Sequence, residues 1–175
     1  MADDLDIHPI RESEFAAAGE ATARAYREFQ RPEWPGYAAY VARIADIPER
    51  ANVATVLVAV VDGVIAGSAT LELTERIRPS STGPLAPDEA HLRMLGVSPE
   101  FRGRGIARGL VIKCIEVARA AGKQRLTLDT APVMVAAQQL YTSMGFTPTP
   151  ERPMPDGSVL LGYSLGIATE APATR

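Results

Sequence analysis

The sequence is poor in the residues that build disulfides and metal sites. It has one cysteine, Cys114, and two histidines, His8 and His91, among 175 residues. A single cysteine excludes an internal disulfide, and so few thiols and imidazoles leave no cluster with metal-ligand spacing. Cys114 falls on the apolar face of an expected helix, which favours a structural thiol over a nucleophile. We therefore expect no metal cofactor.

Long apolar runs and a strong net charge are also missing. No apolar run approaches the length that spans a bilayer, and the acidic first residues do not resemble a secretory signal. With 18 basic and 21 acidic residues the net charge is −3, so no overall basic field recruits nucleic acid or anionic lipid. We expect a cytoplasmic protein without membrane or nucleic-acid partners.

What remains is the composition of an ordinary globular domain, with 46% hydrophobic and 22% charged residues. A chain of this length builds one well-buried core and is too short for two ordinary domains. We expect residues 1–166 to form a single domain and residues 167–175 to be a disordered tail, because the tail has little to bury. The sequence leaves a homodimer open.

Apolar periodicity predicts a strand, two helices, three strands, a helix, a strand, a helix and two strands. The expected strands cover residues 5–10, 54–61, 64–73, 89–97, 125–129, 146–149 and 158–164. The expected helices cover residues 13–29, 37–47, 107–121 and 133–144. Asp62-Gly63 between two β-branched runs is a strong hairpin signal.

A glycine-arginine turn, R-G-R-G-I-A at residues 102–107, joins an expected strand to an expected helix. The first amides of a helix lack partners within the helix and lie at its positive end, where phosphate binds readily. Arg102, Arg104 and Arg108 add cationic donors for phosphate oxygens. A short motif also matches by chance, so an exposed basic helix start that binds nothing is the alternative. The turn fits neither the P-loop nor the dinucleotide fingerprint.

The strand over residues 89–97 carries three ionisable side chains on one face. Period-two geometry places Glu89, His91 and Arg93 together, with apolar residues on the opposite face. Burying three such groups would be costly, so we expect their face to open onto a cleft or, alternatively, onto solvent.

Two motifs together resemble one known family. R-x-x-G-x-A after the strand H-L-R-M-L-G-V is similar to the acyl-CoA pyrophosphate loop of the GNAT superfamily of N-acyltransferases. Residues 137–146, A-Q-Q-L-Y-T-S-M-G-F, resemble the family signature A-x-x-L-Y-x-x-x-G-F. The resemblance implies an α/β fold in which a mixed, mostly antiparallel sheet is flanked by helices. In that fold the fourth and fifth strands splay apart to admit acetyl-CoA.

The same resemblance implies direct transfer of an acetyl group from acetyl-CoA to a primary amine of a small molecule or a protein. Tyr141 takes the place of the family's general acid, which protonates the leaving thiolate. His91 is the first choice as the base that removes the amine proton, Glu89 is the second, and a water chain is a further alternative. A CoA-binding sensor or interaction module without catalysis is the competing function.

The resemblance also assigns binding residues. Those implied for the cofactor are Leu95, Gly96, Val97, Arg102, Gly103, Arg104, Gly105, Ile106, Ala107 and Tyr141. Backbone groups of Leu95 and Val97 would bond the pantetheine arm, and the amides of residues 103–107 would hold the pyrophosphate. Trp34, Tyr37 and Arg93 are the expected acceptor contacts. Many family members carry asparagine where this chain has Met134, so one amide contact to the cofactor is absent or replaced.

Overall fold

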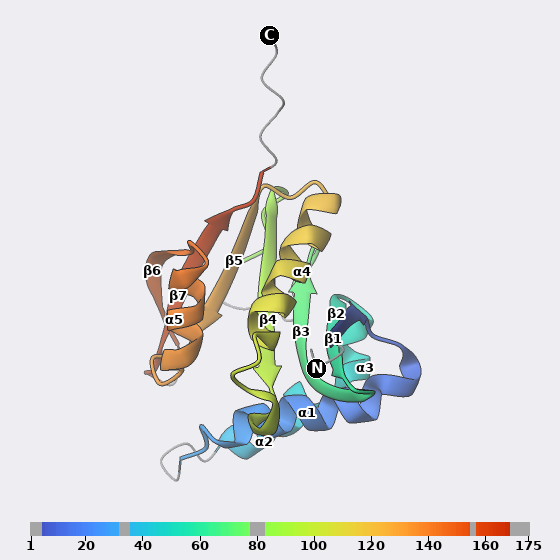
Figure 1. The fold of residues 1–175 in the computed structure, drawn as a ribbon. Helices are drawn as coiled ribbons and strands as arrows, with labels where there is room; N and C mark the ends of the chain where they lie inside the picture. Colours follow the sequence, from blue (N-terminus) through green and yellow to red (C-terminus); the bar gives the residue numbers. More distant parts are fainter. Residues whose placement is uncertain (1–4, 32–35, 78–82, 155–156, 169–175) are drawn as a thin grey trace.

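A computed structural model of the chain describes residues 5–31, 36–77, 83–154 and 157–168. Within these residues seven strands form one sheet in the order β1-β2-β3-β4-β5-β7-β6 (Figure 1). The strands are β1 (Leu5–Pro9), β2 (Thr55–Val61), β3 (Val64–Glu72), β4 (Glu89–Val97), β5 (Arg125–Thr130), β6 (Thr147–Pro153) and β7 (Val159–Gly166). Neighbouring strands are antiparallel except β4 and β5, which are parallel. The expected fold class is confirmed.

Helices cover both faces of this sheet. They are α1 (Phe15–Arg27), α2 (Tyr37–Ile44), α3 (Ile47–Ala51), α4 (Ile106–Ala120) and α5 (Val135–Ser143), with short 3-10 turns at Glu12–Glu14 and Pro99–Phe101. α1 and α3 bury Ala18 and Ile47 against Val58 of β2, whereas α4 and α5 pack on the opposite face (Figure 1). Among the described residues no helix is long and apolar enough to cross a membrane.

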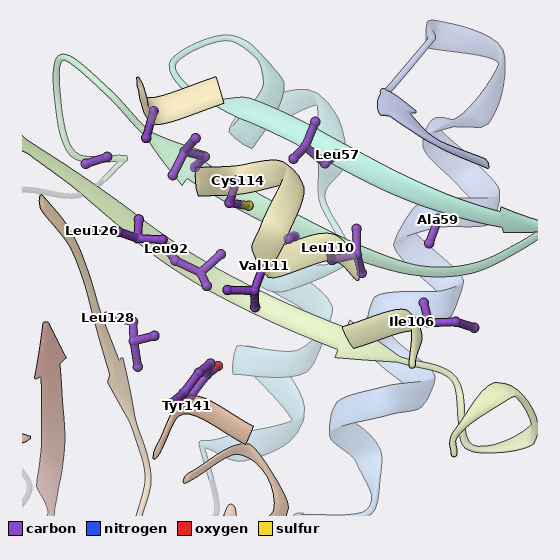
Figure 2. Close-up of a cluster of buried hydrophobic side chains, with 14 of the residues drawn as sticks. Leu57, Ala59, Leu92, Ile106, Leu110, Val111, Cys114, Leu126, Leu128 and Tyr141 are labelled. Atoms are coloured by element: carbon purple, nitrogen blue, oxygen red, sulfur yellow. The ribbon is translucent and has the colours of Figure 1, made fainter. Parts of the chain in front are cut away.

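α4 supplies the centre of the larger core. Its apolar residues recur every three to four positions, which places Leu110, Val111, Cys114 and Ala118 on one buried stripe. These side chains meet Leu92 and its neighbours on the sheet (Figure 2). Cys114 is fully buried and burial raises the pKa of its thiol to about 12. The thiol is therefore part of the packing.

The hairpin between β2 and β3 has the predicted turn. Asp62 and Gly63 both have positive φ, 49° and 79°, as a two-residue turn that follows the twist of the strands requires. Asp62 tolerates this conformation better than most residues with a side chain. The turn fixes the register in which Val61 pairs with Val64.

β4 and β5 separate after a short paired stretch. Their pairing runs from Glu89 with Arg125 to Leu92 with Leu128, although β4 continues to Val97 and β5 to Thr130. Opposite β3, β4 also contains a bulge, where the register shifts and Met94 has φ of 52°. An extra residue of this kind bends the strand. The expected splay of the fourth and fifth strands is confirmed, and the bulge marks its start.

Two local expectations were wrong or incomplete. We expected one helix over residues 37–47 that ends before Pro48, but α2 stops at Ile44 and α3 begins at Ile47. Pro48 lies in the first turn of α3, where a proline needs no amide partner, and Asp46 caps that helix by accepting from the Glu49 amide at 3.1 Å. Ile167, placed in the expected tail, is buried and donates its amide to the Gln124 carbonyl.

Candidate active site

A cavity of about 30 Å³ lies where β4 and β5 separate. It is lined by Tyr26, Leu92, Arg93, Met94, Leu95, Asp129, Thr130, Met134, Ala137 and Tyr141. α1, the bulge of β4, the end of β5 and α5 therefore all contribute to its wall. Thr130 is buried there, and its hydroxyl has no hydrogen-bond partner among the described residues. The cavity joins three of the expected site residues, Arg93, Leu95 and Tyr141, and Met134 lines it beside them.

The glycine-arginine turn of residues 102–107 lies between the end of β4 and the N-terminal end of α4. Gly103 and Gly105 have φ of 76° and 77°, which is the left-handed conformation that glycine adopts without steric cost. A Cβ atom at either residue would meet no atom within 4 Å, so the surrounding space is open. The Gly109 amide bonds the Gly105 carbonyl at 3.0 Å, so the amides of residues 106–108 precede the bonding ladder of α4. These amides form the helix start that the sequence predicts.

The arginines of the turn are held by the protein itself. Arg102 donates from Nε to the Val97 carbonyl at 3.1 Å and pairs with Glu28 at 2.6 Å, so it ties the turn to β4 and to the residues after α1. Arg108 donates to the Ser143 hydroxyl at 2.7 Å. The guanidinium of Arg104 lies over the Phe101 ring, 5.5 Å from its centroid. Arg102 and Arg108 thus fix the position of the loop.

The free edge of β4 after the bulge is reached by two side chains. The Tyr26 hydroxyl donates to the Leu95 carbonyl at 3.3 Å, and Arg102 occupies the Val97 carbonyl. Each carbonyl oxygen has a second lone pair for a ligand. A Cβ at Gly96 would lie 3.0 Å from Ala25 Cβ, so Gly96 lets α1 approach the strand closely.

Tyr141 lies in α5 at the apolar end of the cavity. It is 5% exposed, and its ring contacts Phe146 and Tyr163 with centroids 5.6 and 6.0 Å apart. Burial raises the pKa of its phenol above the usual value, so the hydroxyl keeps its proton at neutral pH. Figure 2 shows Tyr141 beside the core cluster of Leu128 and Val111.

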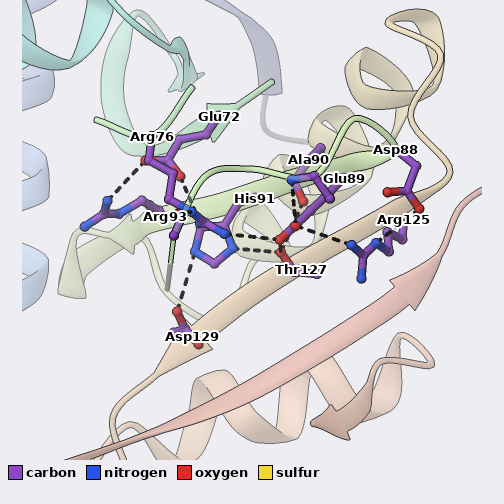
Figure 3. Close-up of polar contacts among 12 residues, drawn as sticks. Glu72, Arg76, Asp88, Glu89, Ala90, His91, Arg93, Arg125, Thr127 and Asp129 are labelled. Atoms are coloured by element: carbon purple, nitrogen blue, oxygen red, sulfur yellow. Dashed lines mark hydrogen bonds and ion pairs between the residues drawn. The ribbon is translucent and has the colours of Figure 1, made fainter. Parts of the chain in front are cut away.

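A hydrogen-bonded chain connects the ionisable residues of β4 to β5 (Figure 3). Thr127 Oγ1 donates to Glu89 Oε1 at 2.6 Å and lies 2.8 Å from His91 Nδ1. Because a hydroxyl has one proton and Glu89 receives it, Nδ1 of His91 must be the donor toward Thr127. When His91 is neutral, its basic lone pair therefore lies on Nε2. That atom faces Asp129 Oδ2 at 3.7 Å.

His91 and Asp129 have shifted acidities. Burial, and then the nearby Arg76 and Arg93, lower the pKa of His91 to about 3, so its imidazole is neutral at physiological pH. Burial raises the pKa of Asp129, while its ion pair with Arg152 works in the opposite direction. Of these two groups only Asp129 lines the cavity. His91 lies behind it.

The face of Glu89 and His91 is covered, contrary to the expectation that it opens onto a cleft or solvent. Glu89 is 8% and His91 7% exposed, and Arg76 from the connection after β3 pairs with Glu89 at 3.4 Å. Arg125 of β5 also pairs with Glu89, at 3.5 Å. Opposite charges brought from distant segments offset the burial cost that the strand alone would incur.

The expected acceptor contacts fall into three groups. Arg93 lines the cavity and donates to Glu72 at 3.1 Å. Tyr37 donates to the Tyr26 carbonyl at 2.9 Å and stacks near Tyr40, so it helps to join α2 to α1. Trp34 lies outside the described residues.

Sequence reasoning missed Asp129, Thr130 and Tyr26. A signal for the first two exists, because Asp129 and Thr130 end the strand R-L-T-L-D-T that runs parallel to β4, and polar residues at such a strand end commonly line a site. Tyr26 gives no such signal, since an aromatic residue on an alanine-rich helix is read as packing.

Comparisons with known proteins agree with this geometry. The family model described as "Acetyltransferase (GNAT) family" matches residues 19–146. The [ribosomal protein bS18]-alanine N-acetyltransferase of Haemophilus ducreyi is 40% identical over 75 residues, which cover 41% of this chain and 52% of that protein. Human N-acetylaspartate synthetase is 32% identical over 111 residues, which cover 63% of this chain and 32% of that protein. The matched parts thus span about half and a third of these relatives.

A solved structure has the same fold over nearly the whole chain. yncA of Salmonella typhimurium, solved with its cofactor acetyl-CoA, superposes with a TM-score of 0.69 at 23% identity, covering 98% of each chain.

Proposed function

The chain belongs to the acetyltransferase (GNAT) family, and from this premise we propose that it is an N-acetyltransferase. It moves an acetyl group from acetyl-CoA directly to a primary amine. The observation that carries the proposal is the position of Tyr141, in a cavity that opens where β4 and β5 separate. The names of the two relatives specify acceptors with an α-amino group, which supports an amine acceptor here.

We propose that two segments hold the cofactor, the start of α4 and the edge of β4 that reaches the cavity at Leu95. The amides of residues 103–107 hold the pyrophosphate at the start of α4, because unpaired amides and the helix dipole both favour an anion there. The unpaired edge of β4 at Leu95 and Val97 bonds the pantetheine arm. An arm held along this edge directs the thioester toward Tyr141.

The amine must lose a proton before it attacks. An aliphatic amine with a pKa of about 10.4 is mostly protonated at neutral pH, so a base near the cavity lowers the barrier. Asp129 is the carboxylate that lines the cavity, and Nε2 of His91 faces it from 3.7 Å. Glu89 fixes the Thr127 hydroxyl and with it the tautomer of His91. His91 and Glu89 are positioning residues in this scheme.

Tyr141 acts at the end of the reaction. When the tetrahedral intermediate collapses, the C–S bond breaks and the CoA thiolate takes the phenolic proton. The high pKa of the buried phenol ensures that this proton is present. The phenolate then recovers a proton from solvent as the products leave.

A thiol-release assay with purified protein, acetyl-CoA and a panel of amines tests the proposal. The panel comprises amino acids, polyamines, aminoglycosides and peptides with free N-termini. We expect release of CoA that depends on one class of amine, with the acetylated amine identified by mass spectrometry. Tight binding of acetyl-CoA without thiol release from any amine would instead support a non-catalytic CoA-binding protein.

A further inference from the structure

The buried guanidinium of Arg50 has no carboxylate within 4.0 Å among the described residues, although the charge of Asp46 acts on it. Arg50 lies in α3 and is 1% exposed. Its Nη1 donates to the Thr70 hydroxyl at 2.6 Å, but its Nε and Nη2 have no hydrogen-bond partner among the described residues. Asp46, at the start of the same helix, uses its carboxylate to cap the Glu49 amide. Burial lowers the pKa of Arg50 to about 10, because it disfavours the charged form more than the nearby Tyr26, Tyr40 and Asp46 favour it.

Arg50 lies next to the cavity wall. Thr70 of β3 pairs directly with Arg93 of β4, so their side chains extend from the same face of the sheet. Arg93 lines the cavity, and its positive charge acts on Arg50. Tyr26 also lines the cavity and interacts electrostatically with Arg50. The Arg93 guanidinium therefore lies in the cavity wall, and the Arg50 guanidinium lies behind it.

Around the polar face of the sheet, one arginine has no carboxylate in contact among the described residues. Its arginines are Arg50, Arg76, Arg93, Arg125 and Arg152, and its carboxylates are Glu72, Glu89, Asp88 and Asp129 (Figure 3 shows most of these). Every one of these arginines except Arg50 has a carboxylate within 4.0 Å among the described residues. A native fold rarely leaves a buried charge unpaired, so each exception needs an explanation, and a missing ligand is one such explanation.

We propose that the acceptor supplies a carboxylate here, so that the amine substrate is a free amino acid whose carboxylate binds to Arg93 and Arg50. The proposal rests on the proposed acetyltransferase function and narrows its substrate class. A planar guanidinium pairs well with a carboxylate through two parallel hydrogen bonds. Arg93 on the cavity wall receives the carboxylate first, and the unpartnered Nε and Nη2 of Arg50 complete its coordination.

Such a site selects against other amines. Polyamines, aminoglycosides and lysine side chains bring positive charge and no carboxylate toward two arginines, which disfavours their binding. A peptide N-terminus has a neutral amide in place of the carboxylate. A free amino acid is therefore the amine that suits both the base at Asp129 and the arginine pair.

The test compares each reactive amino acid with its α-carboxamide, which keeps the amine and side chain and removes the carboxylate charge. The variants are Arg50→Met and Arg93→Gln, with Arg27→Met as a control, since Arg27 is a surface residue of α1 paired with Glu20. For the unchanged protein we expect kcat/KM at least tenfold higher for the acid. In both site variants this ratio falls toward one, mainly through KM of the acid, whereas Arg27→Met leaves it unchanged.

The other outcomes are also decisive. If only polyamines, aminoglycosides or peptides release thiol, or if Arg50→Met and Arg93→Gln keep the acid-to-amide ratio of the unchanged protein, the inference is wrong and the acetyltransferase function stands. If no amine reacts, binding of each amino acid and of its α-carboxamide is measured by thermal shift in the presence of CoA. A rise in melting temperature with the acid but not its amide supports the arginine site, and no rise with either overturns it. Arg93→Gln covers the case in which Arg50→Met fails to fold.

Discussion

The carboxylate of Asp129 and the imidazole of His91 face each other across 3.7 Å, measured from Oδ2 to Nε2. Nδ1 of His91 is engaged with Thr127, so Nε2 faces Asp129 with its lone pair, and Oδ2 of Asp129 also pairs with Arg152. This pairing, at the wall of the cavity, allows a proton to be accepted from the amine without a charged histidine.

Asp129→Asn should lower kcat at neutral pH by about a hundredfold, because an amide cannot take the proton of the amine. Burial raises the pKa of Asp129, and its active form is deprotonated. As the pH is lowered, the activity of the unchanged protein should therefore begin to fall at a pH above the usual carboxyl pKa. The pH-rate profile of Asp129→Asn should not show this fall. Asp88→Asn, at the edge of the polar network, is the control in the same pH-rate measurement.

His91 should make the fold sensitive to acid. Its pKa is about 3 in the folded protein and about 6.5 when unfolded, so the unfolded chain binds more protons between these values. The stabilising effect of a neutral His91 is full above pH 6.5 and is lost as the pH falls toward 3. Chemical denaturation at pH 7 and pH 5 should show a loss of roughly 2 kcal/mol that His91→Gln largely abolishes. An equal loss in the variant would assign the acid sensitivity to other groups.

Tyr141→Phe should reduce kcat by about a hundredfold and leave the dissociation constant of acetyl-CoA nearly unchanged, because only the proton donor is removed. Tyr163→Phe makes the same change in the adjacent ring and should retain activity. Steady-state kinetics and calorimetric titration with acetyl-CoA measure the two quantities separately. Unchanged turnover in Tyr141→Phe would remove this residue from its proposed role.

Gly105→Ala should weaken acetyl-CoA binding about tenfold, since alanine resists the left-handed conformation on which the turn depends. Gly63→Ala is a matched control, because Gly63 has φ of 79° and equally open surroundings but lies in the β2–β3 hairpin. Both changes should lower the free energy of unfolding by about 1–2 kcal/mol. Equal cofactor affinity in the two variants would contradict a phosphate site at this turn.

Met134→Asn should tighten acetyl-CoA binding by about three- to tenfold, which corresponds to one added hydrogen bond. Met134 lines the cavity and occupies the N-cap of α5, where no side chain caps the helix. Asparagine also caps helices well, so the melting temperature without ligand should rise. Met134→Leu keeps the bulk and lacks the amide, and it should produce neither gain.

Periodicity and turn chemistry were sufficient for most of the fold, because they are local. The stripe on α4 and the Asp62-Gly63 turn each appear where the sequence predicts them. The helix boundary at Pro48 was predicted wrongly, since a proline can begin a helix as well as end one. Periodicity alone does not distinguish these two uses.

The site was only partly predictable, because its charge balance is assembled from distant segments. Glu89 and His91 could be placed on one face of a strand, but their burial depends on Arg76 and Arg125 from other parts of the chain. The two unpartnered nitrogens of Arg50 likewise become visible only in the folded structure, where α3 is packed against the sheet. Such compensation is a property of the folded arrangement.

The separation of β4 and β5 leaves a strand edge without a partner strand in the middle of a sheet rather than at its margin. Such an edge suits an extended molecule with amide groups at peptide-like spacing, and α1 and α5 lie beside it. The protein is thereby protected against edge-to-edge aggregation at the place where its backbone could pair with another strand. A bound cofactor would also join the two halves of the sheet mechanically, so amide hydrogen exchange along residues 94–97 and 129–130 should slow together on binding.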